Sequence, residues 1–289
     1  MRRIVLTGAT GFVGANLARA LLILPDIELC ITTRQSSDKW RIAEVSSDFY
    51  RMDNIDLTNR EEVFAYIAEV KPQLIYHVAT YGGLPDQTDA EATIRSNLQA
   101  TMHLIDAAVV HNVEQFIHTG TSSEYGVKHY PMREEDICHP LSLYGISKLA
   151  ATHYVSLIGK TSPMKTCTLR LFSPYGPYEA PSRLYASIVN ALKNNEQPRL
   201  SRPSSVRDFI PIKQVTDIYI RMAQVDYKSG SIINVGSGKQ QTLADFYRTI
   251  AAELGKSNIE PIWGQAAPRA NEPVVWEADI SLLRKILNS

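Results

Sequence analysis

Two residues of the segment LYGISKLA could exchange a proton with a substrate. Tyr144 and Lys148 are four positions apart, a spacing that places two side chains on one face of a helix. An ammonium group near a phenol favours the phenolate and brings the pKa of the tyrosine closer to neutral pH. Such a phenol can act as a general acid or base. The pair therefore predicts a proton-transfer centre in which Lys148 lowers the pKa of Tyr144.

A second group of polar side chains follows an apolar run. The segment HTGTSSEYG at residues 118–126 comes where a strand should end, and it contains Thr121, Ser122, Ser123 and Glu124. Hydroxyl groups at the end of a strand can orient a substrate, and a carboxylate there can move protons. In an alternative, the two serine hydroxyls serve only the turn by bonding to neighbouring backbone. We expect this segment to face the substrate.

The N-terminal segment TGATGFVG has three glycines at a spacing of three. A side chain at such a turn would hold a pyrophosphate away from the start of the following helix, and the third glycine lets helix and strand pack closely. The segment follows an apolar run and opens an amphipathic stretch, as a dinucleotide-binding loop does; a purely structural turn is the alternative. The predicted cofactor contacts are Gly8, Gly11, Phe12, Val13 and Gly14.

The end of the second predicted strand, ITTRQSSD, indicates which dinucleotide binds. A carboxylate there would bind the ribose hydroxyls of NAD, but this chain has Arg34 followed by Gln35 and two serines. A guanidinium with neighbouring hydroxyls suits a 2′-phosphate, so we expect NADP(H) as the preferred cofactor and NAD as the alternative. Arg34 could instead be a solvated surface arginine. Asp56 and Leu57 are further cofactor candidates; Asp56 could also cap the next helix.

The elements that position these residues follow from the hydrophobic pattern. Apolar, β-branched runs alternate with amphipathic stretches of helical length in the first half of the chain. This alternation predicts an α/β fold with a Rossmann-type, doubly wound parallel sheet. The expected strands are 3–6, 27–33, 74–77, 116–119 and 166–172, and the expected helices are 12–24, 60–70, 89–111 and 144–158.

Beyond residue 174 several prolines interrupt this rhythm. We therefore expect an NAD(P)-binding Rossmann domain over residues 1–173. Residues 174–289 should form a smaller C-terminal lobe that mainly binds substrate, with some segments returning to the sheet.

Composition narrows the class of partner. The 289 residues include 30 basic and 30 acidic side chains, so the net charge is zero. This balance disfavours nucleic acid and anionic membranes as partners. We expect no signal peptide and no spanning segment, because neither a long N-terminal apolar core nor a run of roughly 20 apolar residues occurs. The three cysteines lack metal-ligand spacing, so we expect no metal site and a reducing, cytoplasmic location.

Taken together, these motifs resemble the extended short-chain dehydrogenase/reductase family, which includes nucleotide-sugar epimerases, dehydratases and 4-ketoreductases. The resemblance spans nearly the whole chain. It implies that Thr121 is the active-site hydroxyl, that Tyr144 is the catalytic acid or base, and that Lys148 binds the nicotinamide ribose. The motifs that carry it are TGATGFVG, DLT at 56–58, the YxxxK pair, LRLFSPYGP at 169–177, RDFIPIKQVTD at 207–217 and NVGSGKQQTL at 234–243.

The same resemblance implies a nucleotide-sugar substrate. Arg207 and Arg269 would contact its nucleotide diphosphate. Ser173 stands where the family usually has asparagine, and Thr80 and Tyr81 lie in HVATYGG where the family usually has HxAA; we expect all three to contact the sugar. Relatives commonly form dimers through a bundle of two helices per subunit, here those within 89–111 and 144–158, so a homodimer is expected. Core packing of the apolar stripe on the first helix is the alternative.

The hydroxyl segment bears on the reaction. Sugar 4,6-dehydratases look like T-[DS]-E at this strand end, and Ser122 and Ser123 stand at the two acidic positions. A serine cannot act as that base near neutral pH without an activating partner. Glu124 comes one residue late, and adjacent side chains of a strand point to opposite faces. Dehydration is therefore disfavoured.

Two hydride-transfer reactions remain within the resemblance. Arg34 favours NADP(H)-dependent reduction of a nucleotide-linked 4-keto-(6-deoxy) sugar, with Tyr144 as general acid. The alternative is a nucleotide-sugar 4-epimerase that retains its NAD(P). The intact trio of Thr121, Tyr144 and Lys148 disfavours a non-catalytic NADP-binding regulator.

Overall fold

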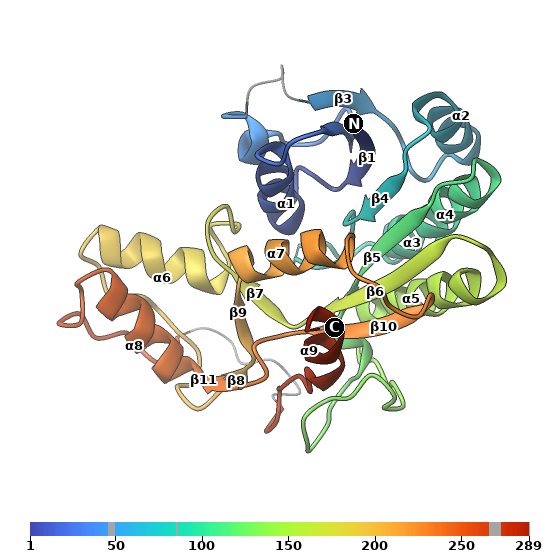
Figure 1. The fold of residues 1–289 in the computed structure, drawn as a ribbon. Coiled ribbons are helices and arrows are strands. Elements are labelled where there is room, and N and C mark those ends of the chain that lie inside the picture. The colour runs from blue at the N-terminus through green and yellow to red at the C-terminus, as the bar shows by residue number, and fades with distance from the viewer. Residues whose placement is uncertain (46–49, 85, 266–272, 289) are drawn as a thin grey trace.

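A parallel sheet forms the centre of the molecule (Figure 1). The computed structural model describes residues 1–45, 50–84, 86–265 and 273–288. Within them the sheet has seven strands in the order β10-β6-β5-β4-β1-β2-β3, all paired in parallel, which confirms the predicted Rossmann-type fold. The strands are β1 (Arg2–Thr7), β2 (Ile27–Thr33), β3 (Tyr50–Asn54), β4 (Leu74–His77), β5 (Gln115–Thr121), β6 (Lys165–Leu171) and β10 (Ser231–Val235).

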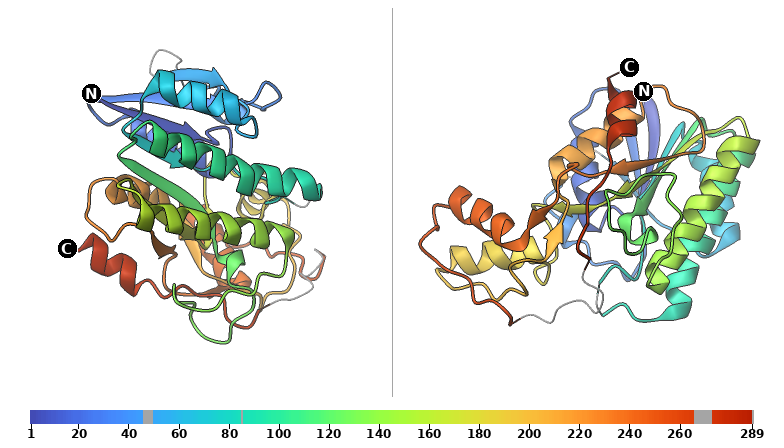
Figure 2. Two further views of the ribbon diagram at one scale, coloured as in Figure 1. Left: turned by 90° about the vertical axis from the view of Figure 1, so that its right-hand side faces the viewer. Right: turned by 90° about the horizontal axis from the view of Figure 1, so that it is seen from below.

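Each face of the sheet is covered by its own layer of helices (Figure 2). Successive side chains of a strand point to opposite faces, so in β1 the side chains of Ile4 and Leu6 join one apolar core and that of Val5 joins the other. The first core is closed by α1 (Phe12–Leu22), α7 (Ile212–Met222) and α9 (Ser281–Leu287). The second is closed by α2 (Arg60–Val70), α4 (Ala100–Val110) and α5 (Leu143–Thr161).

A third apolar core lies beyond the sheet (Figure 1). Here α6 (Leu184–Lys193) packs on α8 (Leu243–Glu253), and the rings of Phe209 and Phe246 stack with centroids 3.7 Å apart. Two small sheets connect this part to the rest: β7 (Ser173–Tyr175) with β9 (Phe209–Pro211), and β8 (Val206–Arg207) with β11 (Gln241–Thr242). Residues 174–289 thus contribute to two parts of the molecule. β10 and α7 belong to the seven-stranded sheet and its helical layer, whereas α6 and α8 form the third core.

The expected helix over 89–111 differs from the observed one. The structure has α3 (Ala90–Ile94), a π-helical turn η3 (Arg95–Gln99) and then α4. The wide turn brings Asn97 inward, where its amide bonds to the backbone of Tyr81 and to the Ser147 hydroxyl. The edge strand β3 was not among the apolar runs, because its sequence YRMDN is mostly polar and only partly covered.

The strand order fixes where a ligand can bind. β1 and β4 are neighbours at the centre of the sheet, and the chain leaves β1 through α1 on one face and β4 through α3 and α4 on the other. The loops after these strands therefore separate and leave a crevice at their carboxyl ends, the usual ligand site of doubly wound sheets. No helix in the described residues has the length and apolar character needed to cross a membrane.

Candidate active site

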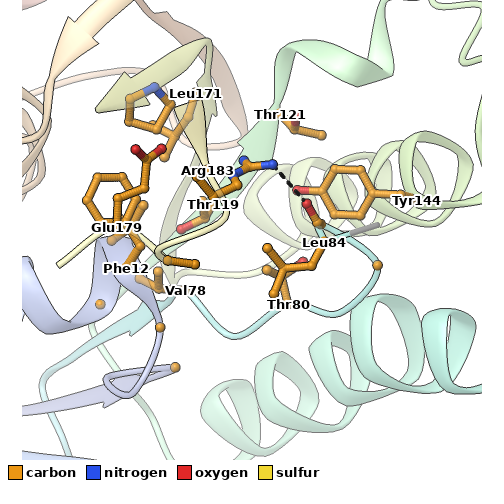
Figure 3. Close-up of a pocket in the computed structure, with 18 of the residues that line it drawn as sticks. Phe12, Val78, Thr80, Leu84, Thr119, Thr121, Tyr144, Leu171, Glu179 and Arg183 are labelled. Atoms are coloured by element: carbon orange, nitrogen blue, oxygen red, sulfur yellow. Dashed lines mark hydrogen bonds between the residues drawn. The ribbon is translucent and has the colours of Figure 1, made fainter. Parts of the chain in front are cut away.

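A cavity of about 930 Å³ opens at the carboxyl ends of β1, β4, β5 and β6 and extends to the α6–α8 part of the chain (Figure 3). It unites motifs that lie far apart in the sequence. The predicted site residues that line it are Gly8, Gly11, Phe12, Val13, Gly14, Arg34, Asp56, Leu57, Thr80, Thr121, Ser122, Ser123, Tyr144, Ser173 and Arg207. Two described candidates, Tyr81 and Lys148, are not part of its lining. Arg269 lies outside the described residues.

The glycine loop fits the pyrophosphate of a dinucleotide. Gly8 has a φ of +73°, and a Cβ on it would stand 2.6 Å from the backbone nitrogen of Ala79. A Cβ on Gly14 would stand 2.1 Å from the Gly8 carbonyl oxygen, so the helix can approach the turn only without one. α1 begins after Gly11 with no described side chain capping it. Its first amide groups are therefore available to an anion in the cavity.

Polar groups from β2 and from the loop after β3 line another part of the cavity. Arg34 follows β2 directly, is exposed, and lines the cavity beside Ser37, whose hydroxyl accepts a 3.0 Å hydrogen bond from the Arg34 amide. The Asp56 carboxylate accepts hydrogen bonds from the amide and hydroxyl of Thr58 at 2.9 and 2.8 Å. The alternative role of Asp56 as a helix cap is wrong, because Asn59 caps α2.

Tyr144 lies in the first turn of α5 and points its ring into the cavity (Figure 3). Ser142 caps this helix by accepting a hydrogen bond from the Gly145 amide, which fixes the turn that carries the phenol. Burial raises the pKa of Tyr144, while hydrogen bonds with the hydroxyls of Thr80 and Thr121 lower it. The net shift of this pKa is thus upward and is set mainly by burial, whereas the sequence predicted a net lowering by Lys148. The phenol keeps its proton at neutral pH and is suited to donate it.

Lys148 is buried one turn further along α5. Its Nζ lies 3.1 Å from Nε2 of His118 on β5. Burial lowers the pKa of the Lys148 ammonium to about 8, and the negative charge of Glu124 opposes that change. The i,i+4 spacing thus places Lys148 near Tyr144 along the helix, but the ammonium is bonded to an imidazole.

Glu124 is buried and lies outside the cavity lining. Its carboxylate forms a 2.7 Å ion pair with Arg170, and it also accepts a 2.8 Å hydrogen bond from the Thr121 amide. The short helix η4 (Ser122–Glu124) turns this side chain inward while Ser122 and Ser123 stay at the cavity. Glu124 therefore holds the loop in shape and is not placed to take a proton from a substrate.

A model of the NAD-dependent epimerase/dehydratase family matches residues 4–236. The chain belongs to this family. The predicted recognition as an enzyme of the extended short-chain dehydrogenase/reductase type is confirmed. Protein CapI of Staphylococcus aureus is 22% identical over 280 residues, which cover 88% of this chain and 84% of CapI.

Solved structures share the fold of this epimerase/dehydratase family member. A UDP-N-acetylglucosamine 4-epimerase from Methanobrevibacter ruminantium has a TM-score of 0.86 at 23% identity, covering 99% of this chain and 91% of its own. A UDP-glucuronic acid 4-epimerase from Bacillus cereus, solved with its sugar nucleotide and NAD, has a TM-score of 0.85 at 24% identity, with coverages of 99% and 93%. A dTDP-glucose 4,6-dehydratase from Bacillus anthracis, solved with NAD, has a TM-score of 0.83 at 19% identity, with coverages of 100% and 91%.

The cavity of this family member also contains residues that the sequence analysis missed. Glu179 lines the wall and accepts a 3.2 Å hydrogen bond from the Ala186 amide in the first turn of α6. Burial raises the pKa of this carboxyl to about 6, and the charge of Arg183 opposes the shift. Arg183 reaches the Gly83 carbonyl at 3.3 Å and so bridges two walls (Figure 3). Neither residue stands at a spacing that signals a site.

Proposed function

We propose that this chain reduces a nucleotide-linked 4-keto-(6-deoxy) sugar with NADP(H) and that Tyr144 is the general acid. The observation that carries the proposal is the junction of three features in one cavity: the glycine loop, the phenol of Tyr144, and Arg34 at the end of β2. Tyr144 lines the cavity, where a protonated phenol can donate to the oxygen of a carbonyl, as the reductive direction requires.

A nicotinamide held in this cavity would supply the hydride for carbon 4 of the sugar. Tyr144 gives its proton to the oxygen of that carbon, and Thr121 donates a second hydrogen bond to the same oxygen. Ser122, Ser123 and Ser173 line the cavity as partners for the sugar hydroxyls, and Arg207 binds the diphosphate. By these assignments residues 1–173 hold the cofactor and also contact the sugar through Ser122, Ser123 and Ser173, and residues 174–289 add Arg207 at the diphosphate.

Each part of the dinucleotide is assigned to groups of this chain. The first amides of α1 bind the pyrophosphate, and Asp56 with Leu57 lines the adenine region. Arg34 and Ser37 bind a 2′-phosphate. Lys148 binds the nicotinamide ribose through hydrogens of its ammonium group.

A second candidate is 4-epimerisation with a retained cofactor. It is favoured by the structural likeness to 4-epimerases, one of them solved with NAD. In that reaction Tyr144 would first take a proton from the 4-hydroxyl and later return it. Dehydration has less support, because Glu124 is engaged with Arg170 away from the cavity.

Cofactor titration tests the role of Arg34. We expect the wild type to bind NADPH more tightly than NADH by about ten- to a hundredfold, since a charge-assisted hydrogen bond contributes about 1.5–3 kcal/mol. Arg34→Ala should remove this preference and leave NADH binding unchanged. Equal affinities of the wild type for both cofactors, measured by calorimetry, would remove the main support for the reductase and favour the epimerase.

A further inference from the structure

His118 lies on β5 beneath the hydroxyl segment, and its ring is fully buried. Its Nε2 lies 3.1 Å from the Lys148 Nζ, and its Nδ1 lies 3.2 Å from the Thr168 hydroxyl on β6. Lys148 is 1% exposed. The proposed mechanism uses Lys148 but gives no role to the imidazole that contacts it.

The hydrogen-bonding partners of His118 determine which of its ring nitrogens carries the proton. An ammonium group has only donors, so the nitrogen that faces it must carry a lone pair. His118 therefore holds its proton on Nδ1, which donates to the Thr168 hydroxyl. A second ring proton, on Nε2, would place an N–H donor against the Lys148 ammonium. Burial and the charge of Lys148 also hold the pKa of His118 well below its usual value. The imidazole is a permanent acceptor for Lys148.

His77 offers a contrast on the neighbouring strand. It pairs with His118 in the sheet, and the two rings stack with centroids 5.7 Å apart. The Thr7 hydroxyl accepts hydrogen bonds from two backbone amides, so its own hydrogen goes to Nδ1 of His77 at 2.7 Å. Nε2 of His77 then donates to the Thr101 hydroxyl at 2.9 Å. His77 is thus an equally buried imidazole that makes no hydrogen bond to Lys148.

We propose that His118 is a positioning residue for the cofactor site, because its unprotonated Nε2 anchors the Lys148 ammonium and keeps it charged. The proposal rests on the role of Lys148 at the nicotinamide ribose given above. The buried ammonium needs such a partner, since the nearby carboxylate of Glu124 is already paired with Arg170. Without an acceptor, burial would convert Lys148 to the neutral amine at lower pH.

The charges around Lys148 determine the sign of the pH effect. Glu124 on η4 favours the ammonium, whereas burial disfavours it; His118 on β5 and His77 on β4 are neutral, and Tyr144 on α5 is protonated. The charged form of Lys148 is therefore present below about pH 8 and lost above it. Cofactor affinity should weaken as pH rises through that value. The midpoint is the pH at which half of this loss of cofactor affinity has occurred. Removing the His118 acceptor should move the midpoint downward by about one to two pH units.

NADPH titrations followed by its fluorescence, from about pH 6 to about pH 10, test this anchor without measuring turnover. His118→Gln puts an amide oxygen near the position of Nε2 and should keep the wild-type midpoint. His118→Asn puts its oxygen near Nδ1, out of reach of Lys148, and should show the lowered midpoint, as should His118→Leu. His77→Leu is the matched control for a buried imidazole and should not move the midpoint. Lys148→Met should abolish the pH dependence.

Equal midpoints in wild type, His118→Asn and His118→Leu would overturn the proposal. A wild-type pH dependence that survives in Lys148→Met would overturn it as well. If His118→Leu does not fold, the Gln and Asn variants still differ by one methylene and give opposite expectations. Cofactor binding with the expected midpoints but no reduction of any keto sugar would contradict the proposed function and leave the anchor standing.

Discussion

At the scale of residues, the proposed mechanism gives Tyr144 and Thr121 separable tasks at the sugar oxygen. Tyr144→Phe keeps the ring and removes the proton, so it should lower turnover by about 10²–10⁴-fold, the usual size of general acid catalysis. Thr121→Val removes a polarising hydrogen bond but no acid, and it also removes the hydroxyl that caps η4 by accepting a 3.2 Å hydrogen bond from the Ser123 amide; we expect it to cost less. NADPH affinity of Tyr144→Phe, measured by fluorescence, should match the wild type and serves as the control. Turnover of Tyr144→Phe at the wild-type rate would exclude the phenol as the acid.

Only some of the site residues could be predicted from the sequence. Spacing predicted that the glycine loop and Tyr144 share a site, and both line the cavity, because turn geometry and helical periodicity are local. Lys148 lies one turn further along α5, outside that lining. The hydrogen-bond partner of Lys148 is not local: it lies on β5, 30 positions away, and only the sheet brings it near. Glu179 was missed for the same reason, since the wall it lines is made by chain folded back over the sheet.

At the scale of elements, the ion pair between Glu124 and Arg170 joins η4 to β6 beneath the active-site hydroxyls. Both side chains are almost fully buried, so Glu124→Gln leaves an uncompensated guanidinium and should destabilise the fold by about 3–5 kcal/mol. Urea denaturation measures this change. Glu69→Gln, which removes the carboxylate of an exposed pair with Arg51, is the control and should cost less than about 1 kcal/mol. Equal costs for the two variants would show that the buried pair does not hold the loop.

The elements themselves were predictable where the hydrophobic pattern was strong. Buried strands such as β1 and β4 read as apolar runs, and α2 begins and ends as its periodicity indicates. The π-helical turn η3 could not be read in this way, because it depends on the bonds that Asn97 makes to the Tyr81 backbone and to Ser147 on α5. β3 was hard to find because an edge strand needs little apolar surface.

At the scale of the whole molecule, α5 leaves an apolar stripe uncovered. Leu143, Ile146 and Leu157 are 36%, 49% and 54% exposed, and their spacing places them on one face of the helix. Of the stripe expected on the preceding helix, Ile105 is buried in the protein's own core. We propose that the face of α5 packs against a second copy of the chain.

Light scattering of the purified protein at micromolar concentration tests this contact. We expect a mass of twice the 32.3 kDa of one chain, and Ile146→Asp should reduce it to that of the monomer, because a charge is costly in an apolar contact. Ile23→Asp alters another exposed isoleucine, at the end of α1, and should leave the dimer intact. A monomeric wild type, or dimers of both variants, would refute this interface.

The most direct test of the proposed activity compares the amount of NADPH consumed with the amount of 4-hydroxy sugar formed. Purified protein is mixed with NADPH and a 4-keto-6-deoxyhexose linked to each common nucleoside diphosphate in turn. The nicotinamide absorbance and the sugar products are then followed together. The proposed function predicts that one substrate consumes one NADPH for each 4-hydroxy sugar formed and that Tyr144→Phe suppresses both signals. A wild type that consumes no NADPH in this assay but, when given a nucleotide-linked 4-hydroxy sugar instead, converts it to the 4-epimer would contradict the reductase and establish the epimerase.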